Sequence, residues 1–117
     1  MRKSFVFLLV VVLVLFSSIA HAEDREFFEL FAVGTPQDVQ RAIEEGVDVN
    51  ARDKSGATLL MWAAMLNENP EVVRVLLEAG ADATLTNSLG KKAIDYAREN
   101  PALKDTDVFW ELYNRSF

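Results

Sequence analysis

Carboxylate side chains are the groups in this sequence with the greatest capacity for acid–base chemistry. They occur as three close pairs, which are Glu44 with Glu45, Glu68 with Glu71, and Asp105 with Asp107. Acid–base catalysis requires two carboxylates whose pKa values are pushed apart in an apolar cleft. All three pairs instead fall on segments that are expected to be exposed or to form loops. We therefore interpret each pair as part of a solvated acidic surface.

The sequence lacks the residues that nucleophilic catalysis and zinc binding require. The sequence has no cysteine, and its one histidine, His21, falls in an N-terminal segment that is expected to be removed. Ser–His and Cys–His arrangements and zinc sites with nitrogen or sulfur ligands are therefore excluded from the remaining chain. Asp48, Asn50 and Asp53 resemble the start of a calcium loop, but the glycine and terminal glutamate of that motif are missing at the required offsets. We expect these three side chains to bind loop amides, and we predict no catalytic residue, no metal and no cofactor.

Residues 1–22 have the three-part layout of an export signal. A basic start is followed by an almost unbroken apolar run from Phe5 to Phe16, and Ala20 and Ala22 place small residues where a signal peptidase cuts. We predict cleavage after Ala22 and export to a bacterial periplasm, with secretion beyond the cell as the alternative destination. An uncleaved membrane anchor is the competing interpretation, because residues 4–22 carry no charge and are about as long as a bilayer-spanning helix.

Cleavage would leave residues 23–117 as one domain of 95 residues, since 22 of the 117 are removed. Loss of Arg2 and Lys3 lowers the basic count from 12 to 10 against 18 acidic residues, which gives a net charge of −8. An acidic domain repels the phosphate backbone of nucleic acids and the surface of anionic membranes, so neither is an expected partner. Without cysteine no disulfide can form, and stability must come from packing alone.

One phrase occurs twice in the chain at a fixed offset. Residues 46–53 read GVDVNARD and residues 80–87 read GADATLTN, and Gly56 with Gly90 keeps the same offset. Each copy directly follows an amphipathic stretch. A repeat of about 34 residues indicates stacked supersecondary units that bury their apolar faces on one another.

The segments between the turn residues have the apolar spacing of helices. Thr35 and Thr58 stand where helix N-caps are expected, Thr106 or Asp107 can cap a last helix, and Gly46 and Gly80 stand just past helix ends. The predicted helices cover residues 26–33, 36–45, 59–66, 70–79, 92–98 and 108–113. The predicted fold class is therefore all-α, an α-solenoid of about three stacked helix-turn-helix units with projecting hairpin-like loops, preceded by the hydrophobic signal helix. The units cover about 26–50, 51–84 and 85–117.

The central unit resembles an ankyrin repeat. Residues 56–64 read GATLLMWAA, which is similar to the ankyrin signature G-x-T-P-L-H-x-A-A, and VVRVLLEAGAD follows downstream. The first unit resembles only the second half of a repeat, and the third keeps Gly90, Ile94 and Ala97 of the signature.

The chain departs from the ankyrin signature at its polar positions. Leu59 and Met61 replace the family's proline and histidine, and Lys92, Ala93 and Asp95 stand where the third unit would have T-P-H. In the family, the threonine and histidine help to tie successive loops together. The resemblance therefore implies that these polar ties are lost or altered, and it predicts modest stability for an array near the three-unit minimum.

The resemblance also implies a protein-binding site. In ankyrin domains the partner usually lies against the loop tips and the inner-helix face. The matching positions here are Lys54, Ser55, Met65, Leu66, Ser88, Leu89 and Lys91. For Met65 and Leu66, packing in the core remains an open alternative, and Trp62 beside them is expected to belong mainly to the core.

These observations predict a monomeric, non-catalytic module in the cell envelope whose partner is another protein. The alternative is an inhibitory or protective subunit for an envelope enzyme or toxin. In that case the acidic surface would guide association with a basic target.

The predicted cleavage has a direct test in the intact mass of the exported chain. We expect a mass that corresponds to residues 23–117, because the A-x-A pattern ends at Ala22. An exported chain that retains the mass of residues 1–117 would instead support the uncleaved anchor.

Overall fold

The computed structural model describes the backbone from residue 21 and the side chains from residue 27 to the C-terminus. The predicted signal peptide, residues 1–22, lies almost wholly outside the described residues, so both its helix and its cleavage stay predictions. From residue 21 onward, no helix combines the length and the apolarity that a membrane crossing requires.

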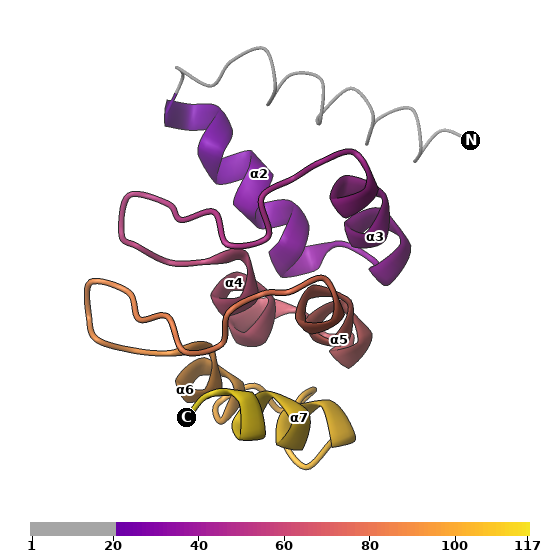
Figure 1. Cartoon of the computed structure of the whole chain (residues 1–117), viewed down its shortest axis with the longest axis vertical. Coiled ribbons are helices and arrows are strands. Elements are labelled where there is room, and N and C mark those ends of the chain that lie inside the picture. Colours follow the sequence, from indigo (N-terminus) through magenta and orange to yellow (C-terminus); the bar gives the residue numbers. More distant parts are fainter. Residues whose placement is uncertain (1–20) are drawn as a thin grey trace.

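The described residues form three stacked layers, each made of two helices (Figure 1). In chain order the layers are α2 (His21–Val33) with α3 (Pro36–Glu44), α4 (Leu59–Leu66) with α5 (Pro70–Glu78), and α6 (Ala93–Ala97) with α7 (Asp107–Arg115). The inner helices α2, α4 and α6 form one column and the outer helices α3, α5 and α7 form a second. Two loops project from the inner column, one before α4 and one before α6 (Figure 1). Apart from one bridge between Arg52 and Thr58, the described residues contain no β-pairing, so the predicted all-α solenoid is confirmed.

Side-chain caps set the starts of the helices. Thr35 accepts the amide of Asp38 at 3.1 Å, Thr58 accepts the amide of Met61 at 3.2 Å, and Thr106 accepts the amide of Phe109 at 3.2 Å. Such bonds satisfy amides that have no partner within the helix. The predicted N-caps at positions 35 and 58 are therefore confirmed, and Thr106 rather than Asp107 caps the last helix.

Two glycines end the outer helices of the first two layers in the same way. Gly46 and Gly80 have φ angles of 98° and 97°. The residue after each glycine donates its amide back to the last helical turn, from Val47 to Ala42 at 3.2 Å and from Ala81 to Leu76 at 3.0 Å. This closing bond requires the left-handed backbone that glycine adopts at little cost.

Helix α4 lies at the centre of the core. It packs against α2, α5 and α6, and Leu59, Leu60, Ala63 and Ala64 are all at most 1% exposed. A helix that is surrounded on nearly all sides needs an apolar surface all round, which explains why its sequence lacks a polar face. The two alanines keep the helices close, as larger side chains there would overpack the contact.

Two buried asparagines join the layers at the ends of the inner helices. The Asn67 amide group donates to the carbonyls of Phe31 and Gly34, each at 3.0 Å. The Asn100 amide group donates to the carbonyls of Ala64 and Asn67, also at 3.0 Å. Each asparagine thus supplies donors to carbonyls at the end of the preceding inner helix, where intrahelical partners are lacking. This role was not predicted from the sequence.

Some element boundaries differ from the predicted ones. α2 begins at His21 rather than at residue 26, α6 is limited to Ala93–Ala97, and α7 extends to Arg115. The connection between α6 and α7 is a series of turns anchored by Asn100, whose carbonyl accepts the amides of Leu103 and Lys104. This connection therefore has an ordered hydrogen-bond pattern.

Replacement of Gly80 by valine tests the helix-ending geometry. We expect Gly80→Val to lower the free energy of unfolding by about 1–3 kcal/mol, because a β-branched residue would have to occupy the left-handed region. No atom lies within 4 Å of the added Cβ, so backbone strain and not collision would cause the loss. Glu78→Val, slightly earlier in the chain on an exposed site, is the control and should change stability by less than about 1 kcal/mol. Equal unfolding midpoints in urea for Gly80→Val and the parent would contradict the assignment.

Candidate partner-binding face

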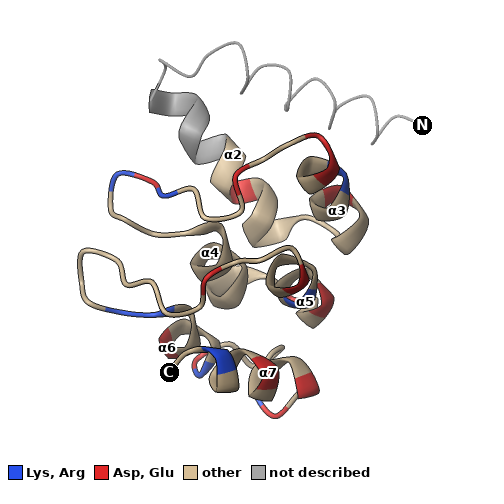
Figure 2. Cartoon of the chain, viewed as in Figure 1, with Lys and Arg blue, Asp and Glu red and all other residues tan. Residues whose placement is uncertain are grey.

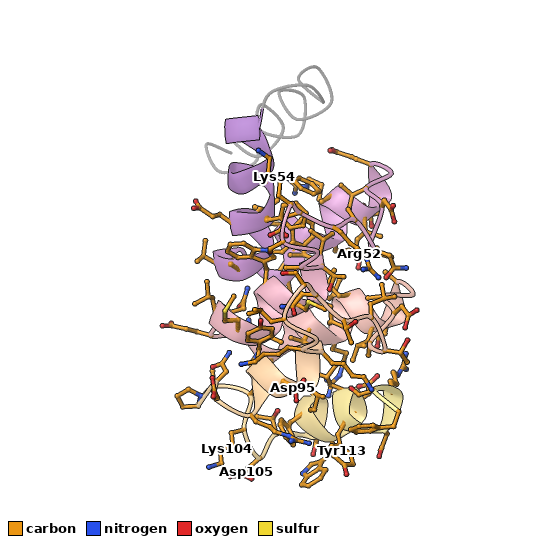
Figure 3. The ribbon with its side chains drawn as sticks, turned by 90° about the vertical axis from the view of Figure 1, so that its left-hand side faces the viewer. Arg52, Lys54, Asp95, Lys104, Asp105 and Tyr113 are labelled. Carbon is orange, nitrogen blue, oxygen red and sulfur yellow. The ribbon has the colours of Figure 1, made fainter. Side chains whose placement is uncertain are left out.

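The structure places five of the seven predicted site residues on the two projecting loops. Lys54 and Ser55 lie at the tip of the first loop, Ser88, Leu89 and Lys91 lie at the tip of the second, and all five are exposed. The Ser88 amide donates to the Ser55 carbonyl at 2.9 Å, so the two tips touch. Figure 3 views the molecule from this side, with Lys54 at the upper end.

Each tip is held by one side chain that accepts several loop amides. Oδ1 of Asp53 accepts the amides of Ser55 and Ala57, both at 2.9 Å. Oδ1 of Asn87, which occupies the equivalent position of the second loop, accepts the amides of Leu89 at 2.9 Å and Lys91 at 3.1 Å. Asp53 was expected to satisfy loop amides, and this expectation is confirmed.

In both layers, an aromatic side chain on the inner helix forms a hydrogen bond with the residue that holds the loop tip. Trp62 Nε1 donates to Asp53 Oδ2 at 3.0 Å, and Asn87 Nδ2 donates to the Tyr96 hydroxyl at 2.6 Å. Trp62 and Tyr96 keep the same offset as Gly46 and Gly80, and Phe28, one repeat before Trp62, packs beside it with ring centroids 6.3 Å apart. Trp62 is partly buried against the core, as expected. Its tie to the loop was not predicted, although the repeat offset could have revealed it.

The hydrogen bonds at Asp53 also set its acidity. Partial burial alone would raise the pKa of the Asp53 carboxyl, but the bonds from Ser55, Trp62 and Ala57 outweigh that effect. The pKa of Asp53 is therefore held below its ordinary value, because the charged form accepts all of these donors.

Further bonds tie the two loops together along their length. Asn50 accepts the amide of Asp82 at 2.8 Å and donates to the Gly80 carbonyl at 3.4 Å, and Arg52 donates to the Thr86 carbonyl at 3.3 Å. The departures from the ankyrin signature were expected to weaken such ties. The structure forms ties with other side chains, which agrees with the expectation that the polar ties are lost or altered.

The remaining predicted residues, Met65 and Leu66, lie at the C-terminal end of α4. They are 37% and 51% exposed, so the alternative that they are buried in the core is not supported. Leu66 lines a groove of about 570 Å³ between the first two layers. Val33 lies in the same groove and is 77% exposed, although it was not among the predicted site residues.

The three carboxylate pairs lie on the surface, as the sequence predicts. The six paired carboxylates are all exposed: Glu44, Glu45, Glu68, Glu71, Asp105 and Asp107. From residue 27 onward, no three acidic, histidine or cysteine side chains are grouped closely enough to hold a metal ion. This face presents exposed loop tips, apolar side chains and backbone groups.

Comparison with known protein families decides the kind of repeat. Residues 43–97 match the family model described as ankyrin repeats (many copies). Residues 43–97 carry ankyrin repeats. This part of the prediction is confirmed, and ankyrin repeats generally serve as protein-interaction modules.

Several curated proteins share the ankyrin-repeat sequence. The chain is 44% identical over 70 residues to a mitochondrial disaggregase of Bos taurus, which covers 60% of this chain and 10% of that protein. It is 37% identical over 67 residues to ankyrin repeat domain-containing protein 40 of Mus musculus, covering 56% of this chain and 18% of that protein. The chain thus spans a fifth or less of the length of these relatives. Both relatives are eukaryotic, so they lend no support to the predicted bacterial source.

Charge is distributed unevenly over the ankyrin repeats (Figure 2). Arg52, Lys54 and Lys91 are exposed at the loop tips, whereas Glu71 and Glu78 are exposed on the outer helix α5. The predicted binding face is therefore locally basic even though the whole chain has a formal net charge of −6. Acidic residues collect mainly on the opposite side, along the outer helices (Figure 2).

The hydrogen bonds of Asp53 predict a pH dependence of stability. Because the pKa of Asp53 is lowered by folding, its contribution is present above the unfolded value of about 3.9 and is lost as pH falls through the lower folded value. We expect Asp53→Asn to be less stable than the parent at pH 7, and the difference to shrink below about pH 4. Trp62→Phe, which keeps a ring but removes the indole donor, should show the same trend with a smaller amplitude. A constant stability difference between Asp53→Asn and the parent across this range, measured by urea unfolding, would contradict the assignment.

Proposed function

We propose that this ankyrin-repeat chain is a non-catalytic module that binds another protein through its loop tips and the exposed end of α4. The observation that carries the proposal is the direct contact between the two exposed tips through Ser55 and Ser88. This contact gathers Lys54, Leu89 and Lys91 on one edge of the molecule. The apolar residues Met65 and Leu66 extend the candidate surface along the inner helix.

The order of the loops supports a role in binding. Asp53 and Asn87 fix the tips internally, and Trp62 and Tyr96 connect them to the inner helices. Binding to loops that are already ordered loses less conformational entropy than binding to mobile ones. Leu89, which is 74% exposed at a fixed tip, is therefore a suitable apolar anchor for a partner.

We further propose that the module works in the cell envelope after export. This part rests on the layout of residues 1–22, where a basic start, an apolar run and Ala20 and Ala22 follow one another. The repeat scaffold supports many different partners, so the fold does not name the one bound here.

Single charges placed on the proposed face test the function. We expect Met65→Asp or Leu89→Asp to weaken partner capture at least about tenfold, because a carboxylate would lose water inside an apolar contact. The melting temperature should change little, since both side chains are exposed. Gln37→Asp adds the same charge at an exposed site on α3 and serves as the control.

The measurement is crosslinking of the full chain in cells and mass spectrometry of the captured protein. The photoactivatable residue stands at position 89 when Met65→Asp is tested and at position 65 when Leu89→Asp is tested. Capture of the partner should be lost in Met65→Asp and in Leu89→Asp, and it should be kept in Gln37→Asp. Equal capture by all variants would argue against this face.

A second candidate function is an inhibitory or protective subunit for a basic envelope enzyme or toxin. The acidic side chains along the outer helices favour it, because they form a surface that could attract a basic target (Figure 2). The association rate with such a target should then fall steeply as salt rises. An association rate that does not depend on salt would count against this candidate.

A further inference from the structure

The two loop tips carry lysines whose charges are not balanced within the fold. Lys54 is exposed on the first tip and Lys91 is exposed on the second. Arginines on the outer helices α5 and α7 form ion pairs with neighbouring glutamates. In the part of the chain whose side chains the structure describes, neither of the two tip lysines has such a partner. Their charges are therefore available to another molecule.

The carboxylates close to the tips are occupied by donors of the chain itself. Both oxygens of Asp53 accept hydrogen bonds from the same repeat, one of them from the Trp62 indole at 3.0 Å. Asp95, at the start of α6, accepts the amide of Lys92 at 2.8 Å. Asn87, which takes the place of Asp53 in the second loop, carries no charge. The charge that the tips present to solvent is therefore mainly positive.

An exposed apolar side chain accompanies these lysines. Leu89 is 74% exposed on the second tip, and the bond from Ser88 to Ser55 joins that tip to the first. The Lys91 Nζ atom lies 5.7 Å from the centre of the Tyr96 ring, a distance at which an ammonium group is attracted to an aromatic face. Two cations and one leucine thus stand on a pair of ordered loops that are fastened to each other.

We propose that the partner presents an acidic segment to the loop tips, with carboxylates opposite Lys54 and Lys91 and an apolar side chain opposite Leu89. This inference rests on the proposed function of the same face. Complementary charges select a partner and its orientation more than they add to its affinity. The acidic side chains along the outer helices sharpen this selection, because they repel an acidic segment from that side of the molecule (Figure 2).

Nucleic acids and anionic membranes are other negatively charged surfaces that lysines bind. Both carry dense negative charge over a wide area, and the chain has a formal net charge of −6. A short acidic segment of a protein can contact the tips without approaching the outer helices. The exposed leucine also favours a protein, since an apolar side chain can be buried against it.

The experiment places a photoactivatable derivative of phenylalanine at position 88, which is exposed on the second tip. The full chain is crosslinked in cells, and the crosslinked segment is sequenced by mass spectrometry. We expect this segment to contain several carboxylates close to an apolar residue.

Reversal of single charges measures the part played by each lysine. Lys54→Glu and Lys91→Glu should each lower the yield of the crosslinked product at least about threefold, and the double variant at least about tenfold, because like charges would then face each other. Lys104→Glu makes the same change on an exposed lysine at the other end of the molecule (Figure 3) and is the matched control. Its yield should stay within about twofold of the parent's.

A charge swap separates loss of complementarity from damage to the fold. Replacement of the carboxylates in the crosslinked segment of the captured protein by lysines should restore the yield with the double variant. A double variant that had lost its fold would not be rescued by a change in its partner.

The possible outcomes distinguish this inference from the proposed function. A captured segment without carboxylates would overturn the acidic partner alone, as would equal yields from all the charge variants or a failed charge swap. Capture from position 65 or 89 without capture from position 88 would do the same. A nucleotide, a lipid or a second copy of this chain crosslinked to position 88 would also overturn it. Absence of a captured protein from positions 65, 88 and 89 would overturn both.

Discussion

The structure depends on the way one layer of helices covers the end of the next. Stacking buries the apolar sides of the layers, but it also encloses carbonyls at the ends of the inner helices, which cannot be left without donors. Asn67 and Asn100 resolve this conflict, because each extends an amide group from one layer to two carbonyls of the layer before it. Since Asn67 both donates to the first layer and accepts from Asn100, the bonds run through all three layers.

The same stacking fixes the surface that is available to a partner. The loops leave the stack beside the inner helices, and their tips are fastened back to those helices by Trp62 and Tyr96. A shift of one layer would therefore move its tip as well. This coupling explains how a domain without disulfides can present ordered loops, and it connects the packing of the core to the geometry of recognition.

The sequence predicts the parts of this structure that depend on local chemistry. Thr35 and Thr58 cap helices, and Gly46 and Gly80 end them, because a hydroxyl acceptor and a residue tolerant of positive φ each solve a problem within one turn. The exposure of Leu89 and Lys91 follows from their place in a turn. The match to ankyrin repeats over residues 43–97 then confirms the family inferred from the central unit.

The parts that could not be predicted depend on contacts between distant residues. Asn100 follows Asn67 by one residue fewer than the repeat offset that separates Gly46 from Gly80. A search at the fixed offset therefore misses the pair. Val33 looks like the last apolar residue of a helix, and only the stacking of the second layer shows that it lines a groove with Leu66.

The most direct measurement of the central claim is the stability of Asn100→Ala in urea. This substitution removes the donor for two enclosed carbonyls, those of Ala64 and Asn67, and should lower the free energy of unfolding by about 1–3 kcal/mol. Asn114→Ala makes the same chemical change at an exposed position of α7 and should cost less than about 0.5 kcal/mol. If the two variants unfold at the same urea concentration, the buried amides do not hold the layers together and the account is contradicted.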